Sequence, residues 1–261
     1  MSYDISPDLF LESHEKNIKR TMLRMKRYLA DPSDESIHDL RTAVRRLDAS
    51  YTVLPKKLRT DSANKKFVTM YKKFFKVSSM VRDLDVMMAR LAKFKTYPAV
   101  AGLLERMREE RSVHLAEGER MAAVLEYLPE PIILPESIPA NKLQRRFNDL
   151  ITPLHDDIIA LLPIVTGDRR RIDELHRLRI RCKKMRYLLE LVQYNIPREL
   201  LKTLQKMQDL LGTIHDCDVM IAFLKNSRQE QDILRVVSAE RQRRQRSYQK
   251  FVVFAEGLAR T

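Results

Sequence analysis

Apolar residues recur every three or four positions along most of this chain, which is the spacing of amphipathic α-helices. The first such stripe contains Ile18, Met22, Met25 and Leu29, and Ser6-Pro7 before it is a typical helix start. Breaks fall at Asp31–Asp34, Pro55 and Tyr97-Pro98. The pattern therefore predicts four helices in the first half, over residues 7–30, 37–54, 61–94 and 98–127.

Residues 129–139 interrupt this pattern, because they hold four of the eleven prolines and cannot be helical throughout. After this linker the same order of elements recurs. We expect a helix that carries Leu143, Phe147, Leu150, Leu154 and Ile158, followed by a break around Pro163–Asp168. A cationic helix follows, and the next helix begins at residues 195–197, with Gly212 as a weak point. The last helix is predicted from about Arg228 to Ala259.

Two pairs of segments are similar to each other. IHDLRTAVRRLDASY (residues 37–51) aligns with LHRLRIRCKKMRYLL (residues 175–189) at an offset of 138, and RDLDVM (82–87) aligns with HDCDVM (215–220) at an offset of 133. Matching blocks in the same order indicate a duplication. We predict an all-α fold in a single domain. It contains repeat 1 (residues 1–128), the linker (129–139) and repeat 2 (140–261), two four-helix bundles related by a pseudo-two-fold.

The duplicated helix concentrates positive charge. On a helical wheel, with about 100° per residue, Arg41 and Arg45 lie near His38, and Leu40, Val44 and Leu47 lie opposite. The second copy places His176, Arg179, Lys183 and Arg186 within roughly 80° of each other. Because like charges at these spacings repel, each stripe predicts a bound anion. The alternative is that acidic residues of neighbouring helices neutralise the stripes.

Composition agrees with this interpretation. Five glycines, no tryptophan and 32% charged residues favour an all-helical protein, and the net charge of +14 favours an anionic partner. Two isolated cysteines, Cys182 and Cys217, form no metal or disulfide pattern. The N-terminus lacks a hydrophobic signal region, and we expect no membrane span, because no apolar run approaches the roughly 18 residues that one needs. We therefore expect a cytoplasmic protein that binds no membrane.

Other motifs are open to more than one interpretation. The dipeptides His38-Asp39, His155-Asp156 and His215-Asp216 resemble those of metal-dependent phosphohydrolases, but flanking cations at His38 repel a divalent metal. We predict no metal, no cofactor and no catalytic residue. In the pairs Asp83/Asp85 and Asp216/Asp218, one member either orients a stripe arginine or forms a helix-surface salt bridge. The basic run 241–250 is interpreted as a solvated face, with a second binding site as the less favoured alternative.

The motifs H-x-x-R-x-x-x-R-R-L (38–47), L-H-x-L-R-I-x-x-K-K-M-R-Y (175–187) and R-D-x-D-V (82–86) resemble those of the CHAD family, the conserved-histidine α-helical domain. The resemblance covers nearly the whole chain. It implies two four-helix bundles with a basic central channel or groove, and binding of inorganic polyphosphate. By position it assigns to the ligand His38, Arg41, Arg45, Arg46, Arg82, His176, Arg179, Lys183, Lys184 and Arg186.

Three further residues join this set on composition and position alone: Lys142, Arg145 and Arg146. Tyr187 joins it as the one candidate for an exposed stacking platform, because it lies on the same side of the helix as His176 and Lys183. The function expected is non-enzymatic polyphosphate binding by a stand-alone CHAD protein, with association with polyphosphate granules as a hypothesis. The alternatives are an RNA- or DNA-binding protein and a metal-dependent phosphohydrolase.

Overall fold

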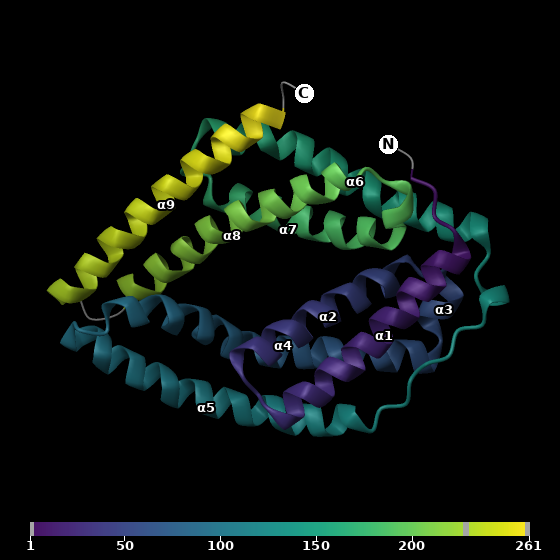
Figure 1. The fold of residues 1–261 in the computed structure, drawn as a ribbon, viewed down its shortest axis with the longest axis horizontal. Coiled ribbons are helices and arrows are strands. Elements are labelled where there is room, and N and C mark those ends of the chain that lie inside the picture. Colours follow the sequence, from purple (N-terminus) through teal and green to yellow (C-terminus); the bar gives the residue numbers. More distant parts are fainter. Residues whose placement is uncertain (1–2, 227–229, 259–261) are drawn as a thin grey trace. The chain divides into compact units, whose positions relative to one another are not determined.

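Helices make up nearly all of this computed structural model, which describes residues 3–226 and 230–258 apart from the side chains of residues 193–195 (Figure 1). The α-helices are α1 (Pro7–Ala30), α2 (Asp34–Val53), α3 (Lys56–Thr60), α4 (Ser62–Leu91), α5 (Pro98–Glu126), α6 (Ala140–Gly167), α7 (Ile172–Leu189), α8 (Arg198–Lys225) and α9 (Gln231–Leu258). Short 3-10 helices are η1 (Ala92–Phe94), η2 (Pro135–Ser137) and η3 (Glu190–Asn195). The described residues contain no strand, so the predicted all-α class is confirmed.

The chain divides into two compact units, each built from segments of both halves of the sequence. Unit 1 comprises the described residues of Met1–Met88, Arg106–Leu150 and Tyr187–Ile196, and unit 2 those of Ala89–Glu105, Ile151–Arg186 and Pro197–Thr261. These units are defined by spatial compactness. The repeats at 1–128 and 140–261, their pseudo-two-fold and the basic channel stay predictions.

Unit 1 is organised around aromatic residues of α1 and α4. The ring of Tyr28 packs edge-on against Phe74 with centroids 5.1 Å apart, and Phe67 lies 4.9 Å from Tyr71. These side chains are fully buried, as are Leu40, Val44 and Leu47 of α2, which the wheel assigned to the core. Gly118 of α5 is required by this packing, because a Cβ there would lie 2.9 Å from the Tyr28 hydroxyl.

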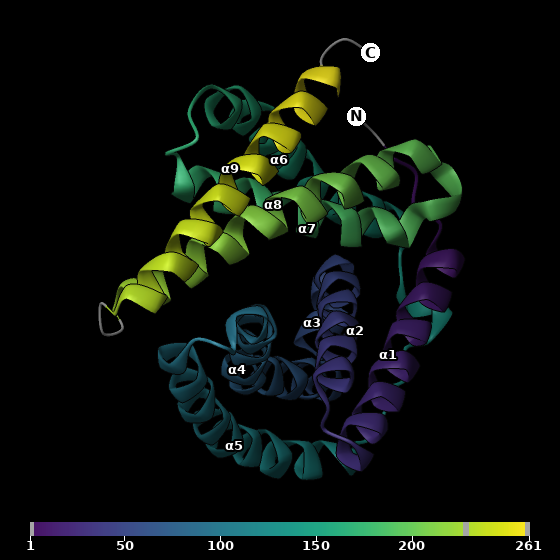
Figure 2. The same ribbon diagram turned by 60° about the vertical axis from the view of Figure 1, so that its left-hand side comes forward.

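Unit 2 contains α7, α8 and α9, each with a buried apolar face. Figures 1 and 2 show α8 and α9 side by side, and they are in extensive contact. The predicted core positions Leu178, Cys182 and Met185 of α7 are buried. A buried ion pair lies within this core, where Arg90 donates to Glu240 and approaches Cys217 Sγ at 3.0 Å.

One salt bridge recurs in the two units. In unit 1, Nε of Arg111 lies 2.5 Å from Asp85 Oδ1, and in unit 2, Nε of Arg244 lies 2.5 Å from Asp218 Oδ1. Both aspartates and both arginines match at the offset of 133 found in the sequence. Asp85 therefore ties α4 to α5, and Asp218 ties α8 to α9. The arginines that they bind, Arg111 and Arg244, do not belong to the cationic stripes.

The break predicted around Pro163–Asp168 is found only at its Asp168 end, between α6 and α7. Helix α6 continues through Pro153 and Pro163 and ends at Gly167. Each proline leaves one carbonyl four residues earlier without its helical donor, at Asp149 and Ile159. Both residues are exposed, so water can bond these carbonyls and the helix tolerates the prolines.

Three smaller differences concern boundaries. The five-residue helix α3 follows Pro55 and was not predicted. Helix α8 runs without interruption through Gly212. The predicted ends of the last helix, Arg228 and Ala259, lie outside the described residues.

Helix α6 is also longer and more apolar than the sequence analysis recognised. An 18-residue window in it has a mean hydropathy of 1.3, which meets the requirements of a membrane span by length and composition only. A core helix of a soluble protein passes the same test, and 28% of this window is buried. Ile151, Leu154, Ile158, Leu161 and Val165 supply that buried face.

The buried His14 makes the stability of unit 1 dependent on pH. Its Nδ1 lies 2.8 Å from Ser50 Oγ, and burial lowers the pKa of the ring to about 4. In an unfolded chain the pKa of histidine is near 6.5. The unfolded state therefore binds more protons between these two values, so stability is present above pH 6.5 and is lost as the pH falls toward 4.

We expect His14→Gln, which keeps a polar group but cannot titrate, to remove this part of the acid sensitivity. In the unmodified chain His14 should contribute a loss of about 3 kcal/mol between neutral pH and pH 4. Urea unfolding across this range measures the slope. His114→Gln, at a less buried position, is the matched control and should keep the slope. An unchanged slope in His14→Gln would contradict the assignment.

Candidate polyanion-binding site

In unit 1, Arg41 of α2 is held by α4. Its side chain is only 6% exposed, although the wheel placed it on the polar side of the helix. The Nη1 atom donates to the carbonyl oxygen of Phe75 at 2.5 Å and to the hydroxyl oxygens of Ser78 and Ser79 at 3.0 and 3.2 Å. Arg41 is therefore a fixed, partly satisfied cation, because α4 covers the side of α2 from which it projects.

Arg45 extends this positive region. The guanidinium carbon of Arg41 lies 3.9 Å from the centre of the Phe75 ring, and that of Arg45 lies 5.0 Å from it. Burial is the largest cause that lowers the pKa of Arg41 to about 10, and the charges of Arg45 and Arg82 lower it further. Asp83 acts in the opposite sense without reversing the shift. Neighbouring cations thus add to the effect of burial on Arg41.

Arg46 lies in a different environment within unit 1. Its Nε donates to Glu190 Oε2 at 2.8 Å, and its guanidinium lies 5.7 Å from the ring centre of Tyr187. Tyr187 is buried, so it does not form the exposed stacking platform that the sequence suggested. In this part of unit 1 an acidic neighbour does balance a stripe arginine, as the alternative hypothesis required.

In unit 2, two histidines meet. The Nδ1 atoms of His176 on α7 and His215 on α8 are 3.1 Å apart, and the ring centroids are 4.5 Å apart. Burial, followed by the charges of Arg179 and Lys183, lowers the pKa of His176, and Asp173 opposes this shift. The pKa of His215 falls to about 4, through burial, Arg179, His176 and Lys183. The pair is therefore neutral at neutral pH and lies in a positive field.

Arg179 is closely packed beside these histidines. Its Nε atom is buried, and a Cβ added at Gly212 of α8 would lie 4.0 Å from it. That distance is an ordinary van der Waals contact, so an alanine would also fit beside this guanidinium. Lys183 is half-buried and Lys184 is exposed, and Arg186 donates from Nε to Gln208 Oε1 at 3.0 Å.

The remaining predicted residues lie in unit 1. His38 is exposed on α2, and Lys142 and Arg145 are exposed on α6. Arg146 donates from Nε to the carbonyl oxygen of Thr52 at 3.1 Å, which attaches it to the end of α2. The structure therefore groups Arg41, Arg45 and Arg82 in unit 1, and His176, Arg179 and Lys183 in unit 2.

Two residues that contact these groups, His215 and Phe75, were missing from the predicted site. His215 aligns with Arg82, and both lie beside the cationic helix of their own unit. The charge of Arg82 lowers the pKa of Arg41 on α2, and the ring of His215 contacts His176 on α7. The alignment could have identified His215. Phe75 was assigned to an apolar run, and nothing in its local sequence indicated that two guanidinium groups cover its ring.

Within the described ranges no group of three or more His, Cys, Asp or Glu side chains could hold a metal ion. The three His-Asp dipeptides thus do not assemble into a common cluster there. His155 simply lies 3.2 Å from the adjacent Asp156.

Comparison with known proteins bears on the whole arrangement. The family model of the CHAD domain matches residues 15–225. The chain belongs to the CHAD family. A search of curated proteins found no match.

Two solved structures share the CHAD fold with this chain. The CHAD domain from the plant Ricinus communis is 16% identical with a TM-score of 0.62, and the match covers 98% of this chain and 93% of that chain. PptA from Streptomyces chartreusis is 16% identical with a TM-score of 0.58, over 94% of this chain and 100% of that chain. At this identity the comparison establishes the fold.

The electrostatic description of unit 2 can be tested with a matched pair of variants. Because Lys183 lowers the pKa of both histidines, we expect Lys183→Met to raise the pKa of His215 and His176. Lys184→Met makes the same charge change one residue away, on an exposed side chain, and should have a smaller effect. Histidine titration by NMR measures both, and equal shifts in the two variants would contradict a local effect of Lys183.

Proposed function

We propose that this CHAD protein binds inorganic polyphosphate without catalysis, through the cations that α2 and α7 present in their respective units. The observation that carries the proposal is the grouping of cations in each unit: the guanidinium groups of Arg41 and Arg45 share the Phe75 ring, and His176 and His215 meet beside Arg179 and Lys183. Neighbouring cations also contribute to the lowered pKa of Arg41 and of His215. Such a field is relieved by an anion. Family resemblance supplies the identity of that anion, since it implies polyphosphate.

The residue types suit a chain of phosphates. Arg45 and Arg179 offer planar forked donors that match phosphate oxygens, and Lys183 offers a compact charge. A neutral histidine pair adds one N–H donor or two, depending on tautomer, and gains charge when a polyanion approaches. Polyphosphate has neither bases nor sugars, so these groups are sufficient for its recognition.

The aromatic residues near the cations favour polyphosphate over nucleic acid. A single-strand binder stacks bases on exposed aromatic rings interleaved with cations. Here Tyr187 is buried, and Arg41 lies over the Phe75 ring at 3.9 Å. Both rings are thus engaged within the protein and are poor platforms for bases.

The proposal includes no chemical step. A divalent metal at the His176–His215 pair would face Arg179 and Lys183, whose charges already disfavour protonation of both rings. A metal-dependent phosphohydrolase needs the opposite field at its histidine ligands.

The central test reverses one charge in each unit. Arg45→Glu with Lys183→Glu should weaken binding of long-chain polyphosphate by about tenfold or more and reduce its salt dependence, because two phosphate contacts are replaced by repulsion. Arg41 is left intact, since its burial makes it part of the fold. Lys26→Glu with Lys206→Glu is the control, with one exposed lysine in each unit and the same change in net charge.

Calorimetric titration at several salt concentrations, with circular dichroism to verify helicity, gives the result. Equal weakening in both double variants would show that only net charge matters. Duplex DNA or RNA that competes equally well at the same phosphate concentration would contradict the choice of ligand, and phosphate release with Mg²⁺ or Mn²⁺ would contradict the absence of catalysis.

A further inference from the structure

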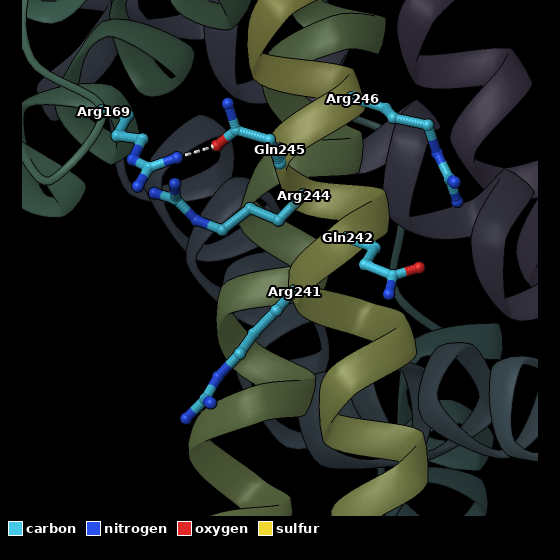
Figure 3. A pocket seen from close by; sticks show the side chains of 6 residues that line it. All are labelled: Arg169, Arg241, Gln242, Arg244, Gln245 and Arg246. Carbon is cyan, nitrogen blue, oxygen red and sulfur yellow. Dashed lines mark hydrogen bonds between the residues drawn. The ribbon is translucent and has the colours of Figure 1, made fainter.

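A surface pocket of about 630 Å³ lies along α9 in unit 2, away from the residues that the predicted site includes. It is lined only by arginine and glutamine: Arg169, Arg241, Gln242, Arg244, Gln245 and Arg246 (Figure 3). A lining that combines guanidinium and amide donors with no carboxylate is suited to an anion.

Three of these arginines gather on one side of α9. Figure 3 shows Arg169, from the segment between α6 and α7, beside Arg244, with Arg241 further along the same side, whereas Arg246 points to the other side. Arg169 donates to Gln245 Oε1, which holds the two elements together. The sequence placed these arginines far apart, and the fold of unit 2 brings Arg169 to the helix.

Arg244 is anchored and still has donor capacity. Its Nε bonds to Asp218 Oδ1 at 2.5 Å, and its side chain is 13% exposed. The Nη2 atom is buried and has no acceptor in the parts of the chain that the structure describes. An unsatisfied donor of this kind is costly, and an oxygen from an anion in the pocket would satisfy it after a small rotation of the guanidinium.

The aligned segment of α5 shows which arginines of α9 have a counterpart in unit 1. At the offset of 133, Arg108 and Arg111 of α5 match Arg241 and Arg244, and the Arg111–Asp85 bridge matches the Arg244–Asp218 bridge. Between and after these arginines the two copies differ.

The difference is one of charge. Residues 108–113 read REERSV, so two arginines and two glutamates give a formal charge of zero. Residues 241–246 read RQRRQR, so four arginines and no acid give +4. The aligned arginines Arg111 and Arg244 form the same salt bridge in both units and so stabilise the fold. Glu109 and Glu110 of α5 are replaced by Gln242 and Arg243 on α9, and this replacement is not needed for that salt bridge. The sequence interpretation of this run as a solvated face does not account for that difference.

We propose that the α9 pocket is a second anion site, which takes a short run of linked phosphates from an inorganic oligophosphate or polyphosphate. Arg169 and Arg241 bind the phosphate oxygens, and Arg244 positions the pocket through Asp218 and adds its remaining donor. The proposal rests on the proposed function only for the kind of anion.

The test uses the full chain and tripolyphosphate as the probe. Arg169→Gln with Arg241→Gln should weaken tripolyphosphate binding at this site by about tenfold or more, which corresponds to the loss of charge-assisted hydrogen bonds. Arg235→Gln with Arg243→Gln is the control, because it removes the same amount of charge at positions of α9 that do not line the pocket. In the unmodified chain, tripolyphosphate should protect Arg169 and Arg241 from modification by phenylglyoxal, as read by peptide mass spectrometry.

The outcomes are separable from those of the proposed function. Protection of Arg169 and Arg241 should persist in the Arg45→Glu, Lys183→Glu variant even where that variant has lost affinity for long-chain polyphosphate. Equal weakening by both glutamine pairs, or no protection of Arg169 and Arg241, would overturn the second site. Neither result alters the expectation for α2 and α7.

Discussion

The constraint on which this structure depends is that each unit holds cations close together and partly out of water. Arg41 in unit 1 is buried against Phe75, Ser78 and Ser79, and the His176–His215 pair in unit 2 lies beside Arg179 and Lys183. Removal of a charge from water is unfavourable unless other groups compensate. Carbonyl and hydroxyl oxygens accept hydrogen bonds from Arg41 and so offset the cost of its burial. The histidines avoid this cost because their lowered pKa leaves them uncharged.

Two pairs of similar segments lie in these two regions. One pair lies on the cationic helices α2 and α7. The other lies on the long helices α4 and α8, where the aligned residues Arg82 and His215 lie beside the cationic helix of their own unit. The Asp85–Arg111 and Asp218–Arg244 bridges then tie each long helix to the next one. The salt bridge occurs in both units, whereas the charges around it differ between α5 and α9. On α9, the Nε atom of Arg244 therefore stabilises the fold, and the neighbouring arginines can be assigned to the proposed second site.

Sequence periodicity was sufficient to predict the fold class, most helix boundaries and the buried face of each cationic helix. It failed at Pro163, because the effect of a proline depends on whether the freed carbonyl is solvated. It also could not distinguish Arg41 from Arg45, since a wheel describes one helix and not the neighbour that covers it. The same limit hid Phe75 as a partner of both arginines and Arg169 as a neighbour of α9. His215 was within reach of the sequence, through its alignment with Arg82.

The account requires the polyanion to act directly on the positive field of unit 2. The most direct measurement is the NMR titration of His176 and His215 with and without saturating long-chain polyphosphate at constant ionic strength. Because an anion stabilises the protonated ring, the pKa of both histidines should rise, and binding below pH 6.5 should take up protons. Polyphosphate that binds without changing either titration would show that the ligand does not occupy the cationic helices.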